Sequence, residues 1–146
     1  DVAFVFSVQE EVGLRGAQVA AYGIEPQTGI AIDVTSACDT PTGPKLEIAL
    51  GKGPAIKVMD ARFLSSPEVI ALMERAAKAA KVPCQKEILT GGTTDASAIQ
   101  LARAGVRSGC LSIPCRYVHS PNETVSLSDL QNGARLLLAA LTEPAL

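Results

Sequence analysis

Apolar and polar positions alternate in short runs along this chain, and longer stretches with helical spacing separate these runs. Runs rich in β-prone residues predict strands at residues 2–8, 29–34, 85–89 and 108–119. Residues 46–61 predict strand pieces interrupted by a turn, because residues 51–54 read Gly-Lys-Gly-Pro.

Two stretches in the N-terminal half have helical spacing. An alanine-rich helix at residues 14–22 is expected to end at Gly23, which serves as its C-terminal cap. The clearest helix spans residues 67–82, where Ser66 can cap the helix and Pro67 suits its first position. The predicted buried face of this helix consists of Val69, Leu72, Met73, Ala76, Ala77 and Ala80.

Two more helices are predicted in the C-terminal part of the chain. Residues 96–104 form a helix that Gly105 stops, and residues 127–141 form a helix begun by Ser126 and Asp129. The predicted buried stripe of the last helix is Leu130, Ala134, Leu137, Leu138 and Leu141. The alternation of strands and helices favours an α/β sandwich of layers in a single domain, without repeats or linkers.

Composition narrows the classes of partner. The chain is 47% hydrophobic and 19% charged, with a formal net charge of -2 and no cluster of Lys and Arg, so neither a nucleic acid nor an anionic membrane is an expected partner. No apolar run reaches the roughly 18 residues of a membrane-spanning helix. The N-terminus shows no signal peptide and opens inside a strand-like pattern, as if an upstream segment had been removed.

The four cysteines, Cys38, Cys84, Cys110 and Cys115, include no CxxC pair. Because Cys110 and Cys115 are five positions apart, they would face opposite sides of one continuous strand. Small buried thiols in a reducing compartment are the favoured interpretation. A zinc knuckle or a disulfide framework is the alternative.

Polar residues gather at the predicted strand ends, where α/β folds place functional side chains. Glu10 and Glu11 follow the first strand, and at a strand end both carboxylates can approach one centre. One could then ligate a metal while the other takes a proton from water, although a solvated acidic strand end is the simpler alternative for the pair alone. The adjacent pair does not suit the opposed carboxylates of a glycosidase.

Asp33 and His119 extend this set. Asp33 follows an apolar strand, which indicates either a loop cap or a binding role, and a single histidine such as His119 is more often structural than a ligand. Taken together, Glu11, Asp33 and His119 suit zinc, cobalt or manganese. Residues 90–93 lack the spacing of a phosphate-binding loop, so a tight loop that brings backbone close to a substrate or a neighbouring element is favoured.

Four segments resemble the glutamyl and deblocking aminopeptidases, a family of metallopeptidases that use two metal ions together. The resemblance covers nearly the whole chain, with the motifs in the family's order. The segments are residues 4–17 (FVFSVQEEVGLRGA), 31–35 (AIDVT), 92–96 (GTTDA, one threonine more than the family's loop) and 113–120 (IPCRYVHS), the last followed by Glu123.

The resemblance implies a fold and a setting. Residues 1–146 would be the C-terminal portion of a zinc-peptidase-like catalytic domain, an α/β fold built as a three-layer α/β/α sandwich with a mixed sheet and incomplete at its N-terminus. The upstream catalytic segment and an inserted small β domain would be absent. The family further implies a cytoplasmic protein that forms homo-oligomers.

The resemblance also implies a reaction, the removal of N-terminal residues from peptide substrates by a metal-dependent aminopeptidase. Glu10 would be the general base, Glu11 and His119 would bind one divalent ion, and Asp33 would bind the other. The two ions, zinc, cobalt or manganese, would activate a water, so that no nucleophilic side chain is needed.

Two ligands of the family, an upstream histidine and a bridging aspartate, have no counterpart in this sequence, and Asp39, Asp60 and Asp95 match no ligand position. The fragment alone is therefore expected to bind metal weakly and to be nearly inactive. Two alternatives stay open: a non-catalytic, peptidase-like scaffold that serves assembly, and a carbohydrate hydrolase that works without metal.

Overall fold

A mixed five-stranded sheet organises the chain in the computed structural model, which describes residues 1–43 and 47–142. The strand order is β1-β4-β2-β3, with the short β5 paired to β4. The pairs β1–β4 and β2–β3 are parallel, whereas β4 runs antiparallel to β2 and β5. The strands are β1 (Thr28–Ser36), β2 (Ala55–Met59), β3 (Gln85–Ile88), β4 (Arg107–Arg116) and β5 (Thr124–Val125).

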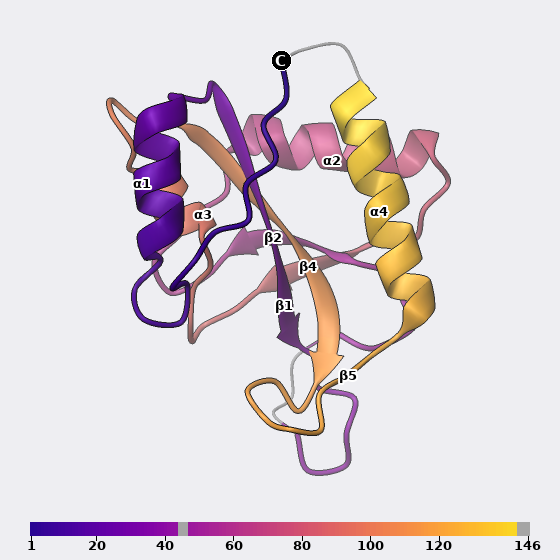
Figure 1. The fold of residues 1–146 in the computed structure, drawn as a ribbon. Helices are drawn as coiled ribbons and strands as arrows, with labels where there is room; N and C mark the ends of the chain where they lie inside the picture. Colours follow the sequence, from indigo (N-terminus) through magenta and orange to yellow (C-terminus); the bar gives the residue numbers. More distant parts are fainter. Residues whose placement is uncertain (44–46, 143–146) are drawn as a thin grey trace.

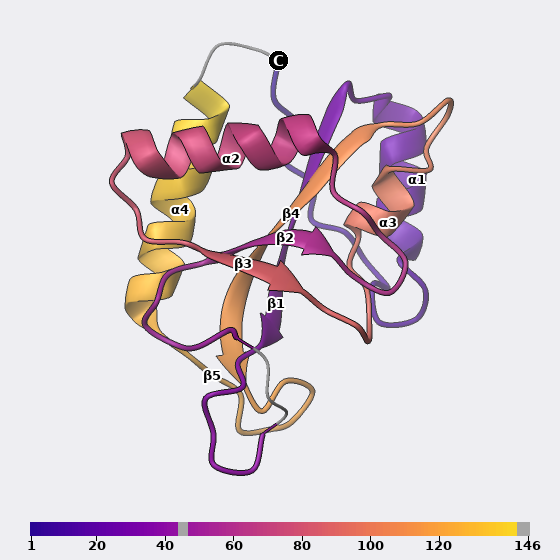
Figure 2. The ribbon, with the colours of Figure 1, turned by 180° about the vertical axis from the view of Figure 1, so that it is seen from behind.

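Helices lie on both faces of this sheet (Figures 1 and 2). They are α1 (Arg15–Ile24), α2 (Pro67–Ala79), α3 (Ala96–Ile99) and α4 (Leu127–Thr142). On one face, α2 and α4 pack over β2 and β4 around Met73, Leu111 and Leu136. On the other face, α3 packs over β1 and β4 around Ala31 and Cys110, and α1 packs against α3. The prediction of an α/β fold with a mixed sheet is confirmed.

The strand predictions succeed where a neighbouring strand is present. Residues 29–34 and 85–89 correspond to β1 and β3, and the turn at residues 51–54 leads into β2. The strand predicted at residues 108–119 corresponds to β4 as far as residue 116, whereas residues 117–119 lie in the following loop. Residues 47–50 are not a strand, and residue 46 lies outside the described residues. The strand predicted at residues 2–8 is wrong: this segment pairs with no described strand, and Phe6 is 96% exposed. A strand needs a neighbour for its backbone N–H and C=O groups, and apolar alternation alone supplies none.

The helix predictions are correct in place and wrong in several details. Helix α1 continues through Gly23 and ends at Ile24, because the next residue, Glu25, has a φ of 54° that breaks the helical path. Ser66 stands at the N-cap of α2 without capping it through its side chain, because its Oγ instead accepts the Ser108 N–H at 3.0 Å. Helix α3 ends at Ile99, five residues earlier than predicted, where the chain passes into turns that lead to Gly105.

The buried stripe predicted for α4 is largely wrong because, of its five residues, only Leu137 packs, partly buried, against the core. Leu130, Leu138 and Leu141 are exposed, whereas Asp129, Gly133, Leu136 and Ala140 face the core. The cause is the fully buried Asp129 carboxylate, which accepts the N–H groups of Gly51 at 2.7 Å and Gly53 at 2.8 Å. This anchor rotates the helix so that the side of Asp129 faces the sheet. The predicted helix-start residue therefore fixes the turn before β2 instead.

Within residues 1–43 and 47–142, no helix combines the length and apolar character needed to cross a membrane. The four cysteines are free. Cys110 and Cys115 are buried as predicted, but Cys84 is exposed and Cys38 is half-buried.

Candidate functional site

The four predicted site residues line one cavity of about 610 Å³. Glu10 and Glu11 come from the turn before α1, Asp33 from β1, and His119 from the loop after β4. The loop between β3 and α3 closes another side through residues 91–94. The side chains thus meet although 109 positions separate Glu10 from His119 (119 − 10).

The turn that carries Glu10 and Glu11 is held by backbone hydrogen bonds. The Glu10 carbonyl accepts the N–H groups of Gly13 at 3.1 Å and Leu14 at 2.9 Å. The Gly16 N–H donates to the Val8 carbonyl at 2.9 Å, and a Cβ at Gly16 would lie 2.4 Å from the Val8 nitrogen. Glycine is therefore required for this close approach, which fixes the segment ahead of Glu10 against the start of α1.

Asp33 lies on the sheet face that α3 covers, because it is two residues from Ala31, which packs against α3. Its side chain accepts the Val34 N–H at 2.7 Å, so the carboxylate is oriented by its own strand. Asp33 is half-buried, unlike Glu11, whose side chain is 72% exposed. The structure therefore offers one recessed and one open carboxylate to the cavity.

His119 is held by a strained loop. Tyr117 and His119 have φ values of 59° and 62°, a conformation that L-residues seldom adopt and that often marks functional sites. The His119 N–H donates to Glu123 Oε1 at 2.7 Å, which fixes the backbone. Its Nε2 lies 3.2 Å from Glu11 Oε1, so the predicted partners on one ion are in contact.

An ion pair holds the start of this loop. Arg116 donates from Nε and Nη2 to the two Asp39 carboxylate oxygens, each at 2.8 Å. The Arg116 guanidinium holds the pKa of Asp39 at about 2, below its ordinary value of 3.8. The two parallel hydrogen bonds fix the relative orientation of both side chains, and the pair joins the end of β4 to the segment after β1.

The loop predicted at residues 90–95 brings backbone close to neighbouring elements. The Gly92 carbonyl accepts the Ala61 N–H at 3.2 Å, and the Thr93 hydroxyl donates to Asp60 at 3.0 Å. The Ser7 hydroxyl donates to Asp95 at 2.5 Å, which links this loop to the segment ahead of Glu10. One oxygen of each spare carboxylate is therefore engaged, whereas Asp60 Oδ2 and Asp95 Oδ1 are buried without a hydrogen-bond partner among the residues that the structure describes.

Negative charge accumulates in the cavity. Burial raises the pKa of Glu10 above its ordinary value, and the nearby carboxylates of Asp33, Glu11 and Asp95 raise it further. His119 opposes this shift. A carboxylate with a raised pKa is a better proton acceptor, which is the property that a general base requires.

Burial is also the main reason that the pKa of Asp33 is raised. The hydrogen bond from Val34 and the positive charge of Lys57 oppose this effect, while Asp95 and Glu11 add to it. Two carboxyl groups of one cavity thus have raised pKa values, partly because neighbouring carboxylates repel their charged forms. Such a cluster favours a bound cation, which would relieve the repulsion.

A buried polar network lies beneath the cavity. Lys57 Nζ is 3.0 Å from Glu87 Oε1, with side chains 0% and 1% exposed. The hydroxyls of Thr35 and Ser112 also donate to Glu87, the latter at 2.6 Å. Because β1, β2, β3 and β4 each contribute one of these residues, the network ties together the strands beneath Asp33.

The residues of the cavity fit divalent metal ions in their chemistry. Carboxylate oxygens and an imidazole nitrogen are the donors that zinc, cobalt and manganese accept. Among the described residues, no group of three or more His, Cys, Asp and Glu side chains is close enough to hold an ion. Glu11 and His119 are in contact, and the assignment of this pair to one ion and of Asp33 to the other stays a prediction.

Sequence reasoning missed three features of this cavity. Arg62 lines it from the segment between β2 and α2, and no motif marked this residue. The Ser7–Asp95 hydrogen bond and the Arg116–Asp39 pair are contacts between distant segments, so local patterns carry no signal for them. The acidic side chain of Glu123 was noted, and its role in holding the His119 backbone emerges only from the geometry.

Comparisons with known proteins agree on one family. The model of the M42 glutamyl aminopeptidase family matches residues 1–136. A protein of Acetivibrio thermocellus is 50% identical over 141 residues, which cover 97% of this chain and 43% of that protein. The lysyl aminopeptidase of Pyrococcus furiosus is 42% identical over 144 residues, covering 98% of this chain and 41% of that enzyme.

Solved structures give the same result. An aminopeptidase of the archaeon Desulfurococcus kamchatkensis superposes with a TM-score of 0.88 at 47% identity, over 95% of this chain and 40% of that one. The TET1 peptidase of Pyrococcus horikoshii, which can assemble into a tetrahedron or a large octahedral shell, gives a TM-score of 0.79 at 38% identity, over 93% of this chain and 39% of that one. This chain thus spans about two fifths of the length of these relatives.

Proposed function

Because the chain belongs to the M42 glutamyl aminopeptidase family, we propose that the polypeptide carrying it is a metal-dependent aminopeptidase that removes N-terminal residues from peptides. One observation carries this proposal. Glu10, Glu11, Asp33 and His119, which come from three separate segments, line a single cavity in which Glu11 and His119 are in contact. A complete catalytic domain of three layers, α/β/α, is part of the proposal.

In the proposed reaction, Glu11 and His119 hold one divalent ion and Asp33 holds the other. When bound, such ions acidify a water molecule and polarise the carbonyl group of the scissile bond. Glu10 accepts the proton of the attacking water and returns it to the leaving amine. The raised pKa of Glu10 supports this role, because a stronger base is better matched to a proton transfer near neutral pH.

We also propose the substrates, the oligomeric state and the cellular location of the protein. The substrates are peptides, and the protein acts as a homo-oligomer, as the TET1 peptidase of Pyrococcus horikoshii does. A cytoplasmic location is supported by the four free cysteines, which suit a reducing compartment. The metal is zinc, cobalt or manganese, and activity measured with each added ion identifies the preferred one.

The test is hydrolysis of a panel of aminoacyl anilides by the longest natural polypeptide that contains this sequence, with added zinc, cobalt or manganese. Glu10→Gln is expected to lower kcat by about 10²–10⁴-fold. The matched control Glu68→Gln, in the first turn of α2 outside the cavity, is expected to keep wild-type activity. A chelated sample should be inactive.

Two outcomes would contradict the proposal. Activity that survives chelation and Glu10→Gln would point to another chemistry, including the carbohydrate hydrolase alternative if sugars are cleaved instead. A metal-loaded, full-length protein without peptidase activity would leave a peptidase-like scaffold that serves assembly.

A further inference from the structure

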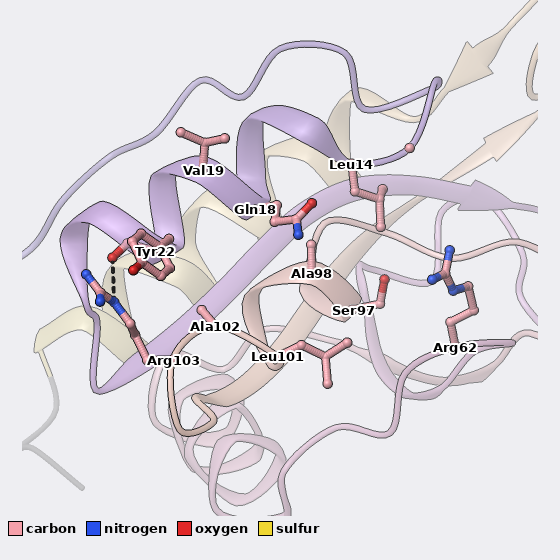
Figure 3. A pocket seen from close by; sticks show the side chains of 11 residues that line it. Leu14, Gln18, Val19, Tyr22, Arg62, Ser97, Ala98, Leu101, Ala102 and Arg103 are labelled. Atoms are coloured by element: carbon pink, nitrogen blue, oxygen red, sulfur yellow. Dashed lines mark hydrogen bonds between the residues drawn. The ribbon is translucent and has the colours of Figure 1, made fainter.

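A second cavity, of about 590 Å³, lies between α1 and α3 (Figure 3). Its walls are mostly apolar, and Val19 and Leu101 are each 74% exposed there. Arg62 lies at one end of this groove in Figure 3 and Arg103 at the other, beside Tyr22. The α1–α3 groove is large enough for several side chains, since pockets for small ligands hold roughly 300–1,000 Å³.

The α1–α3 groove adjoins the candidate site. Gly13, Leu14 and Arg62 line both cavities. The turn that ends at Leu14 also carries Glu10 and Glu11, so the groove opens beside the predicted general base. The two cavities therefore share part of one wall.

The two arginines of the groove differ in their partners. Arg103 is occupied: its guanidinium stacks on the Tyr22 ring at 3.5 Å and pairs with Glu25 at 2.5 Å. Arg62 is exposed, and no hydrogen bond or ion pair of its side chain occurs among the described residues. Arg62 thus presents a free guanidinium at the junction of the two cavities, where a carboxylate is its natural partner.

We propose that the α1–α3 groove binds the part of a peptide substrate that follows the scissile bond, and that Arg62 binds an acidic side chain of that part. The inference rests on the proposed aminopeptidase function. An aminopeptidase has one residue before the bond that it cleaves, so an adjoining groove large enough for several side chains suits the residues that follow this bond. The apolar walls can contact the side chains of peptides of any sequence, and Arg62 favours peptides that carry an acidic side chain.

The test compares two tetrapeptides with the same first residue, one with glutamate and one with glutamine at the second or third position. Wild-type enzyme, full-length and metal-loaded, is expected to prefer the glutamate peptide by about tenfold in KM, the effect of one hydrogen bond to a charged group. Arg62→Gln is expected to bring the KM ratio close to one. Arg62→Lys, which keeps the charge, should retain part of the preference.

A second pair of variants tests the apolar walls. Leu101→Ser should raise KM for both tetrapeptides, and the control Leu138→Ser, an exposed leucine of α4 outside the groove, should not. A glutamate preference that survives Arg62→Gln would overturn the proposal, as would equal KM values for both peptides in the wild type. Either result would indicate that another part of the assembled protein, and not the substrate, occupies the groove. Hydrolysis of aminoacyl anilides tests the proposed function separately, because these substrates carry no residue after the scissile bond.

Discussion

Glu87→Gln is the most informative change in the sheet beneath the cavity. The substitution keeps the shape of the side chain and removes its charge. Lys57 is then left with its ammonium group 0% exposed and without its ionic partner. A buried charge without a partner is not compensated for the hydration that it lost, so the free energy of unfolding is expected to fall strongly.

Removing one partner of a buried ion pair costs about 3–5 kcal/mol. Complete burial of both side chains places this pair at that level, and not at the level of an exposed pair. For a domain of this size, such a loss corresponds to a fall in Tm of roughly 6–20 °C. It is also a large part of the ~5–15 kcal/mol that keeps a typical domain folded.

Urea unfolding at constant pH, followed by far-UV circular dichroism, measures the effect. The matched control is Lys86→Gln, which breaks the exposed Lys86–Glu74 pair in the same strand and should cost less than about 1 kcal/mol. The double variant Lys57→Met/Glu87→Leu removes both charges and should be more stable than Glu87→Gln. A Glu87→Gln midpoint equal to that of Lys86→Gln, or a double variant less stable than Glu87→Gln, would refute the reasoning.

Two further predictions concern the ends of the sheet and its packing. The Asp39–Arg116 pair lowers the pKa of Asp39 from 3.8 to about 2. Its stabilising effect is therefore complete above about pH 4 and is lost as the pH falls towards 2. In acid titrations, the difference in stability between wild type and Asp39→Asn should close over that range. Gly109→Ala should destabilise by about 1–3 kcal/mol, because its Cβ would lie 2.5 Å from a Val69 methyl and 3.1 Å from the Met73 methyl; thermal unfolding should show Val69→Ala relieving part of this loss in the double variant.

The sequence predicts the fold well where the pattern and the neighbours agree. The apolar run of β4 lies between β1 and β2 and is buried almost throughout, so its composition reflects its place. Residues 2–8 are even more apolar, yet they pair with no described strand. The periodicity of a segment indicates which secondary structure it favours, whereas strand pairing also requires a second segment that supplies hydrogen-bond partners.

The same limit applies to α4 and to the site. The leucines of α4 form a helical stripe in the sequence, but the buried face of the helix is a neighbouring one that contains Asp129, whose carboxylate accepts hydrogen bonds from the turn at residues 51–53. In the site, the residues at strand ends were predicted to converge, and they do line one cavity. The contribution of Arg62 was not predictable, because its importance comes from two cavities that meet only in the folded chain.

The contact between Glu11 and His119 has a consequence for the order of events during synthesis. These residues are 108 positions apart (119 − 11), so their meeting closes a loop of nearly the whole chain. Contacts between such distant residues form slowly, and a ribosome delivers the N-terminal partner first. A growing chain that has not yet reached residue 119 carries three of the four acidic and imidazole groups but lacks the histidine. Of the four residues of the candidate site, His119 is therefore the last to be synthesised, and the Glu11–His119 contact can form only after β4.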